Sequence, residues 1–99
     1  MKVHTEAVQF KADQKLIDFI EKKLQKLELV YDRIIQAEVF LRLENSGQVK
    51  DKVAEVVIDV PGERLVAKET DKTFEVAIDG AATALRRQLI KYKERLKPA

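Results

Sequence analysis

Residues that could carry out covalent chemistry or hold a metal ion are few and scattered in this sequence. There is no cysteine and His4 is the single histidine, which excludes disulfide frameworks, zinc clusters and thiol chemistry. Ser46, the only serine, lies in a turn-forming segment without the placed base that nucleophilic catalysis needs. Asp71, Glu75 and Asp79 are acids of the kind that the first turns of a helix favour. The sequence therefore predicts a binding protein, with no catalytic residue, metal or cofactor.

The basic residues are the more informative set, because their charge is unevenly distributed along the chain. The net charge of the 99 residues is only +2. Residues 27–85 nevertheless have a net charge of −5, whereas residues 86–99 hold six Lys or Arg against one Glu, a net charge of +5. A basic segment on an acidic body can steer a protein onto a polyanion. Lysine and arginine grip phosphates without reading bases, so this pattern favours structured RNA, recognised through its backbone.

Helical spacing predicts which face of each helix carries these cations. In the first predicted helix, Lys15, Lys22 and Lys26 lie together opposite the apolar stripe, with Asp18 and Glu21 to one side. In the second, like charges repeat every four residues, which destabilises an isolated helix, and the helix dipole accounts for only one or two of them. We therefore expect an anionic partner. The six cations of the second helix are Arg87, Lys91 and Arg95 on one flank of the apolar stripe, and Arg86, Lys93 and Lys97 on the other.

Apolar periodicity predicts the elements that position the cations. Alternating residues predict strands and residues repeating every three or four positions predict helices, with Asp13 capping the first helix and Asp71 or Thr73 capping the second. Pro61-Gly62 suits a type II turn, and Asn45-Ser46-Gly47 another turn. We predict an α+β fold, one four-stranded sheet with both helices on one face, as a single domain of residues 1–99. The strands are expected near 2–9, 35–44, 53–60 and 64–70, and the helices near 13–27 and 73–97.

Two stretches of the sequence carry a family resemblance. One is Lys22-Lys23-Leu24-Gln25-Lys26-Leu27, followed by Tyr31-Asp32-Arg33-Ile34. The other is Ala77-Ile78-Asp79-Gly80, followed by the basic run at residues 85–97. In order and spacing they resemble the short-form ribosome hibernation-promoting factors, or ribosome-associated translation inhibitors, over nearly the whole chain.

This resemblance implies a fold related to double-stranded RNA-binding domains and a site in the mRNA/tRNA channel of the small ribosomal subunit. Occupancy of that site would inhibit translation, as part of a stress response. The sequence has neither the apolar region of a secretory signal nor a run of about 18 apolar residues, so we expect a cytoplasmic protein that does not enter a membrane. We also expect a monomer when free, without a small-molecule substrate or the additional C-terminal domain of long family members. The residues that the resemblance assigns to ribosomal RNA (rRNA) contacts are Lys22, Lys23, Lys26, Arg86, Arg87, Lys91, Lys93, Arg95 and Lys97.

The sequence departs from the family pattern at Thr73 and Glu75, where relatives often have Asp and an aromatic residue. Helix capping and local rRNA contacts at this point need not follow the family. Two other functions stay open. One is a general double-stranded RNA-binding module that acts on free structured RNA. The other is a protein-interaction adaptor whose basic C-terminal helix meets an acidic partner.

Overall fold

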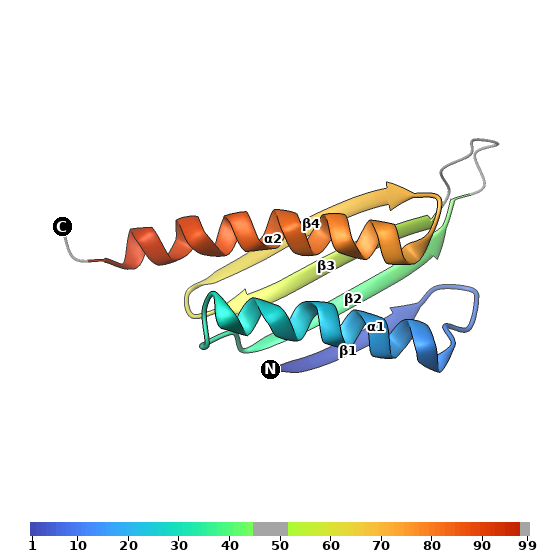
Figure 1. Ribbon diagram of the computed structural model, residues 1–99, viewed down its shortest axis with the longest axis horizontal. Coiled ribbons are helices and arrows are strands. Elements are labelled where there is room, and N and C mark those ends of the chain that lie inside the picture. The colour runs from blue at the N-terminus through green and yellow to red at the C-terminus, as the bar shows by residue number, and fades with distance from the viewer. Residues whose placement is uncertain (45–51, 98–99) are drawn as a thin grey trace.

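The computed structural model describes residues 1–44 and 52–97, and its element order is the predicted one (Figure 1). The predicted turn at Asn45-Ser46-Gly47 and the helix stop at Pro98 lie outside the described residues. All four strands and both helices are confirmed, most of them to within one residue at each end. The elements are β1 (Lys2–Ala7), α1 (Gln14–Gln25), the 3-10 helix η1 (Lys26–Leu29), β2 (Gln36–Leu43), β3 (Lys52–Val60), β4 (Glu63–Asp71) and α2 (Phe74–Leu96).

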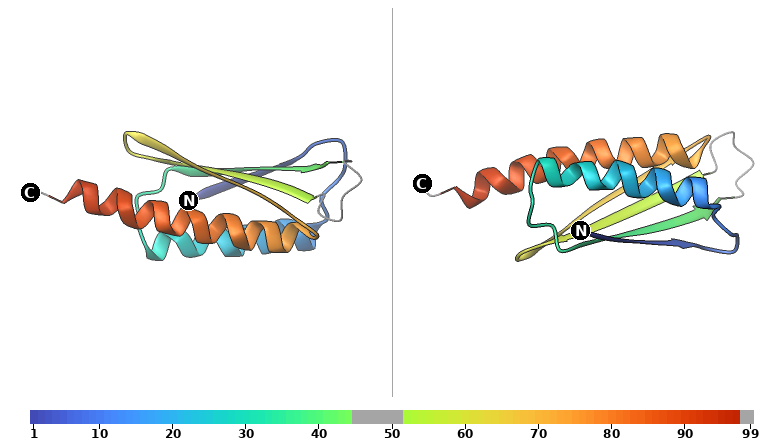
Figure 2. Two further views of the ribbon diagram at one scale, coloured as in Figure 1. Left: turned by 90° about the horizontal axis from the view of Figure 1, so that it is seen from above. Right: turned by 60° about the horizontal axis from the view of Figure 1, so that its bottom comes forward.

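The four strands form one mixed sheet in the order β1-β2-β3-β4. β1 runs parallel to β2, with α1 as the crossover between them, and the other two pairs are antiparallel. Both helices pack on the same face of the sheet, as predicted, so the molecule has two layers (Figure 2). No helix within residues 1–44 and 52–97 covers the other face of the sheet. The helix layer is consequently the surface on which the predicted cations are displayed.

A single hydrophobic core lies between the two layers. Alternate strand residues such as Val39 and Ile58 point toward the helices and are fully buried, and they meet Ile20 from α1 and Leu85 and Leu89 from α2. Burial of such side chains drives folding and fixes both helices against the sheet. Truncation of Leu85 to Ala should cost about 2–5 kcal/mol, because little can collapse into the space.

Both helices begin at a side-chain cap. The Asp13 carboxylate accepts a 2.8 Å hydrogen bond from the Leu16 backbone N–H, as predicted. At α2 the cap is Thr73, whose hydroxyl accepts a 3.1 Å bond from the Val76 N–H. Asp71, the other predicted candidate, instead accepts a bond from the Lys72 N–H. The departure from the family pattern at Thr73 therefore leaves the helix capped.

Two element ends differ from the predictions by two residues. β1 stops at Ala7 instead of residue 9, because Gln9 adopts a left-handed conformation with φ of 64°, which turns the chain out of the strand. α1 stops at Gln25, and the chain continues as η1 instead of an α-helix to residue 27. The tighter turn still buries Leu27, whose carbonyl accepts bonds from the N–H groups of Val30 and Tyr31.

Gly62 and Gly80 each occupy a position at which the structure favours a residue without a side chain. Gly62 has φ of 79°, as the third position of the predicted type II turn requires. Gly80 lies inside α2, where a Cβ atom would come within 3.3 Å of the Glu69 side chain on β4. The missing side chain thus leaves room for the Glu69 side chain beside α2.

Candidate nucleic-acid interface

All nine cations predicted to contact rRNA lie on the helix layer or at its ends. Lys22 and Lys23 are on α1, Lys26 is on η1, and Lys97 directly follows α2. Eight of the nine residues are exposed, and only Lys23 is half-buried. The C-terminal part of α2 extends past the turn between β3 and β4, so its last turns project beyond the sheet (Figure 1). Cations on both flanks of that projecting end are accessible to a large partner.

Three of the nine cations surround a groove between the two helices. Lys23 and Lys26 approach from the α1 side and Arg86 from α2, and the groove also contains Asp79 and Ala82. We call this the inter-helix groove. Its cations come from segments far apart in sequence, which the packing of α1 against α2 brings together.

Lys23 is committed to internal contacts. Its ammonium nitrogen lies 2.8 Å from a carboxylate oxygen of Asp79 on α2, and the two side chains are 34% and 51% exposed. The same ammonium lies 5.6 Å from the centre of the Phe19 ring, at cation-π distance. An RNA phosphate that reaches Lys23 must therefore compete with Asp79.

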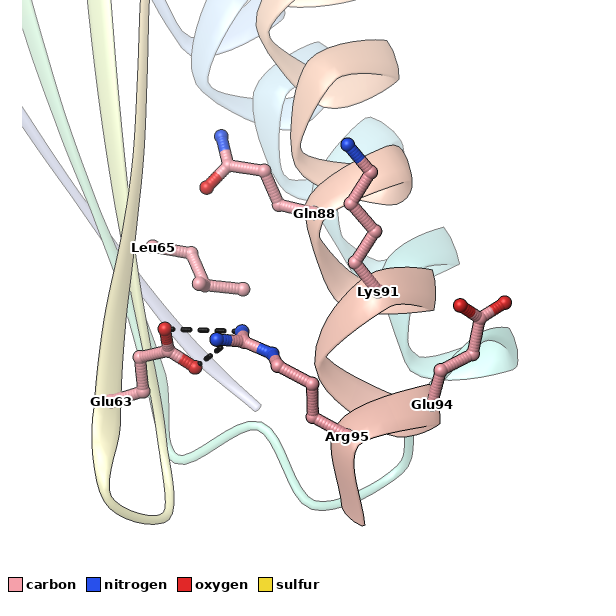
Figure 3. Close-up of a pocket in the computed structure, with 6 residues that line it drawn as sticks. All are labelled: Glu63, Leu65, Gln88, Lys91, Glu94 and Arg95. Atoms are coloured by element: carbon pink, nitrogen blue, oxygen red, sulfur yellow. Dashed lines mark hydrogen bonds and ion pairs between the residues drawn. The ribbon is translucent and has the colours of Figure 1, made fainter. Parts of the chain in front are cut away.

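The opposite flank of α2 faces β4 and holds Lys91 and Arg95 in a second hollow (Figure 3). The Arg95 guanidinium donates to both carboxylate oxygens of Glu63, at 3.1 and 2.8 Å. Lys91 points away from this ion pair, and Gln88 donates a 2.9 Å bond to the Val66 carbonyl on β4. Lys91 is thus the cation of this hollow with its charge directed to solvent.

A further cation, Arg33, was not among the nine predicted residues. It is exposed and lines a hollow with Lys93, at the loop between η1 and β2. The family-like segment Tyr31-Asp32-Arg33-Ile34 contains it, so its position in a shared motif was the available signal. Arg33 extends the basic surface toward the end of α2.

The predicted lysine stripe on α1 is less uniform than expected. Lys15 and Lys22 line the same hollow as Asp18 and Glu21, although these acids were expected to lie to one side. Long side chains reach across more than one helical position, so an angle on a helical wheel does not separate charges of opposite sign. Lys26 is not part of this group, because η1 carries it to the inter-helix groove.

Two tyrosines hold the basic end of α2 in place. The Tyr92 ring packs edge-to-face on Tyr31, with ring centres 5.3 Å apart. The Tyr92 hydroxyl donates a 2.6 Å hydrogen bond to the Pro61 carbonyl in the turn between β3 and β4. Burial of this side chain raises the pKa of Tyr92 above its usual value. The contacts join α2, the loop after η1 and the sheet at the point where α2 leaves the sheet.

The helix-free face of the sheet has no such excess of positive charge. Strand alternation assigns an equal number of acidic and basic residues to this face within the described strands. Two of them are joined as an ion pair, with Arg64 2.8 Å from Asp59. The excess of cations therefore lies on the helix layer, chiefly along the C-terminal half of α2. The charged residues of the sheet face are Lys2, Glu6, Glu38, Arg42, Glu55, Asp59, Arg64 and Lys68.

Within residues 1–44 and 52–97, no three His, Asp or Glu side chains are grouped so that they could hold a metal ion. In the same part of the chain, no helix combines the length and the apolar character needed to cross a membrane.

A two-layer fold with exposed cations along its helices has the form of a binding domain whose helix surface is suited to a polyanion. The sequence model of one family, described as sigma 54 modulation protein / S30EA ribosomal protein, matches residues 3–97. The chain therefore belongs to this family.

Curated relatives and solved structures agree with that assignment. The chain is 35% identical over 95 residues to a ribosome hibernation promoting factor from Azotobacter vinelandii, covering 96% of this chain and 85% of the relative. It is 35% identical over 82 residues to a protein of the same name from Escherichia coli K12, covering 83% and 82%.

Two solved structures have the same fold. The N-terminal domain of Thermus thermophilus Protein Y superposes with a TM-score of 0.82 at 28% identity, over 93% of this chain and 99% of that one. A ribosomal subunit interface protein from Coxiella burnetii has a TM-score of 0.85 over 95% and 99% of the two chains, and at 21% identity it shows the fold alone.

Proposed function

We propose that this protein is a ribosome hibernation factor that binds the small ribosomal subunit in the mRNA/tRNA channel. It inhibits translation by occupying the channel, without catalysing a reaction, and acts in the cytoplasm as a monomer until it binds. Family membership and the names of the Azotobacter and Escherichia relatives support the ribosome as its target.

The observation that carries the proposal is the distribution of charge between the two faces. Cations lie on both flanks of α2 and on η1, whereas the helix-free face of the sheet balances its acids and bases. Binding to phosphates releases counterions from the RNA, so such a surface gains affinity without contacts to bases. The end of α2 projects beyond the sheet, so cations on both of its flanks can reach rRNA while the rest of the helix layer faces the same partner (Figure 1).

Sedimentation through sucrose gradients tests the proposal directly. We expect purified protein to migrate with small subunits and to inhibit a cell-free translation system in proportion to its occupancy, with recovery when the protein is removed. An excess of free duplex RNA should not release it from the subunit. Preference for free duplexes over ribosomes would instead indicate a general RNA-binding module, and cleaved rRNA would show that a catalytic step exists.

A substitution on α1 separates the proposal from the adaptor function. Lys22→Glu alone should weaken subunit binding, because both helices meet rRNA. An adaptor that uses only the C-terminal helix would bind normally with this change. Lys22→Glu combined with Lys91→Glu should abolish binding to purified small subunits, with thermal melting as the control for folding.

A further inference from the structure

We propose that the inter-helix groove holds one unpaired nucleotide of rRNA, with its base against an apolar floor and its phosphates at the surrounding cations. This inference rests on the proposed function and specifies which part of the RNA the groove recognises. A surface that only neutralises phosphates would need no recess between the helices. The lining of the groove combines cations, an acceptor and an apolar floor, which is the mixed chemistry that a nucleotide presents.

The floor of the groove is apolar. It consists of Leu27, which is 3% exposed, together with the half-buried side chains of Val30 and Ala82. The groove is open to solvent and has a volume of about 390 Å³, near the lower end of the range of about 300–1,000 Å³ typical of small-molecule sites. Other surface hollows of the protein are larger, so the chemistry of the lining and not the volume carries the inference. A planar base laid on this floor would remove apolar surface from water on both partners.

The rim adds an exposed leucine. Leu29 is 88% exposed and lines the groove at the end of η1. A single exposed leucine is common in proteins, but this side chain adjoins the apolar floor and extends it outward. An unpaired base is the part of RNA that can cover such a surface, because its faces are released from stacking when it leaves a helix.

The cations of the rim are suited to the flanking phosphates. Within the part of the chain that the structure describes, Lys26 and Arg86 are exposed and take part in none of the ion pairs. A guanidinium can grip a phosphate with two parallel hydrogen bonds or stack on a base, and a lysine acts as a point charge. Their charge complements that of a nucleotide on either side of its base.

Asp79 distinguishes this groove from a simple phosphate site. A carboxylate repels a phosphate, and a groove that served only phosphates would be better without it. Carboxylate oxygens accept hydrogen bonds from the amino groups of bases. The Asp79 carboxylate is 51% exposed, and its ion pair with Lys23 leaves acceptor capacity for such a bond. The neighbouring Thr83 hydroxyl donates a 3.0 Å hydrogen bond to the backbone carbonyl of Asp79. A donor-rich rim, an acceptor and an apolar floor together match a whole nucleotide.

The test fills the groove without changing its charge. Ala82→Leu places a larger apolar side chain on the floor, and Ala84→Leu is the matched control, because Ala84 is a half-buried alanine on the same helix that lines a different hollow. Binding of each full-length protein to purified small subunits is measured across a salt series. We expect Ala82→Leu to weaken binding about tenfold at every salt concentration. Its salt slope should equal that of the wild type, because the number of neutralised phosphates is unchanged.

A second variant keeps the test valid if Ala82→Leu does not fold. Leu29→Ser changes an 88% exposed side chain, so folding should not depend on it, and it should also lower affinity without changing the salt slope. Chemical probing should show one unpaired nucleotide protected by the wild type and by Ala84→Leu, and reactive with Ala82→Leu. The groove proposal is wrong if the wild type binds small subunits and both Ala82→Leu and Leu29→Ser bind them with the affinity of the wild type. If wild type does not bind them at all, the proposed function itself is wrong.

Discussion

The ammonium of Lys23 on α1 and the carboxylate of Asp79 on α2 face each other across the inter-helix groove at 2.8 Å. This ion pair joins the two helices. It also neutralises Lys23, which is one of the cations of the proposed RNA site. Both side chains are partly exposed, so the pair contributes little to the stability of the protein. Its main effect is on how much positive charge the free groove presents.

Asp79→Asn should therefore strengthen binding to small subunits. Asparagine keeps an acceptor oxygen in the groove but releases Lys23 for a phosphate, so the salt slope should become steeper by up to about one unit. Affinity at low salt should rise severalfold, while the thermal melting temperature should change little. Titration of labelled protein into subunits at several salt concentrations measures both quantities, and weaker binding with an unchanged slope would contradict the prediction.

The two cations of the hollow against β4 should differ in their effects. Lys91→Ala should reduce the magnitude of the salt slope by up to about one unit and weaken binding. Arg95→Ala should reduce it less, because Glu63 already neutralises the Arg95 guanidinium. Lys68→Ala on the helix-free face is the matched control and should leave binding unchanged. Equal losses of affinity for Lys68→Ala and Lys91→Ala would show that the RNA does not bind specifically on the helix layer.

Acid should destabilise the protein partly through Asp59. Hydrogen bonds from Arg64 at 2.8 Å and from Gln36 at 2.9 Å hold the pKa of this carboxyl below its usual value. Because the folded-state pKa is the lower one, the stabilisation is present at neutral pH and is lost as the pH falls below about 4. Asp59→Asn should lose less stability than the wild type between about pH 5 and pH 2. Urea unfolding across this range measures the difference, and identical pH profiles would refute the assignment.

Tyr92→Phe should loosen the projecting end of α2. The substitution removes the hydrogen bond to the Pro61 carbonyl but keeps the ring contact with Tyr31, so the urea midpoint should fall moderately. Burial raises the pKa of Tyr92, so its contribution to stability is present below about pH 10 and is lost as the pH rises through the folded-state value. The wild type should therefore lose more stability than Tyr92→Phe above that pH. A variant that unfolds like the wild type at pH 7 and at high pH would contradict this.

Most of the fold can be predicted from the sequence because its signals are local. Alternation in β2 and β3, the cap at Asp13 and the turn at Gly62 each depend on neighbouring residues. The strand order and the parallel pairing of β1 with β2 were not predicted, because alternation does not specify which strands become neighbours. The 3-10 turn η1 was missed for a related reason, since it depends on how Leu27 reaches the core.

The candidate site could be predicted only as a set of cations. Helical spacing placed Arg86 and Arg87 on opposite flanks of α2, and the structure agrees. The partners of Lys23 and Arg95 could not be predicted, because Asp79 and Glu63 approach them only through the packing of separate elements. Periodicity within one helix contains no information about the distance to another. The inter-helix groove has the same origin, so no single stretch of sequence reveals it.

The parallel pairing of β1 with β2 also has a consequence for the order in which the molecule assembles and opens. Lys2 pairs with Gln36, 34 positions away, whereas β3 and β4 pair across the turn at Pro61-Gly62. Closing the longer loop costs more chain entropy, so the β3-β4 hairpin can form early and β1 must join late. Among the described strands, β1 lies at an edge of the sheet and is hydrogen-bonded to β2 alone. Its amides should therefore be among the first of the sheet to exchange with deuterium, while those of β3 persist until the whole protein unfolds.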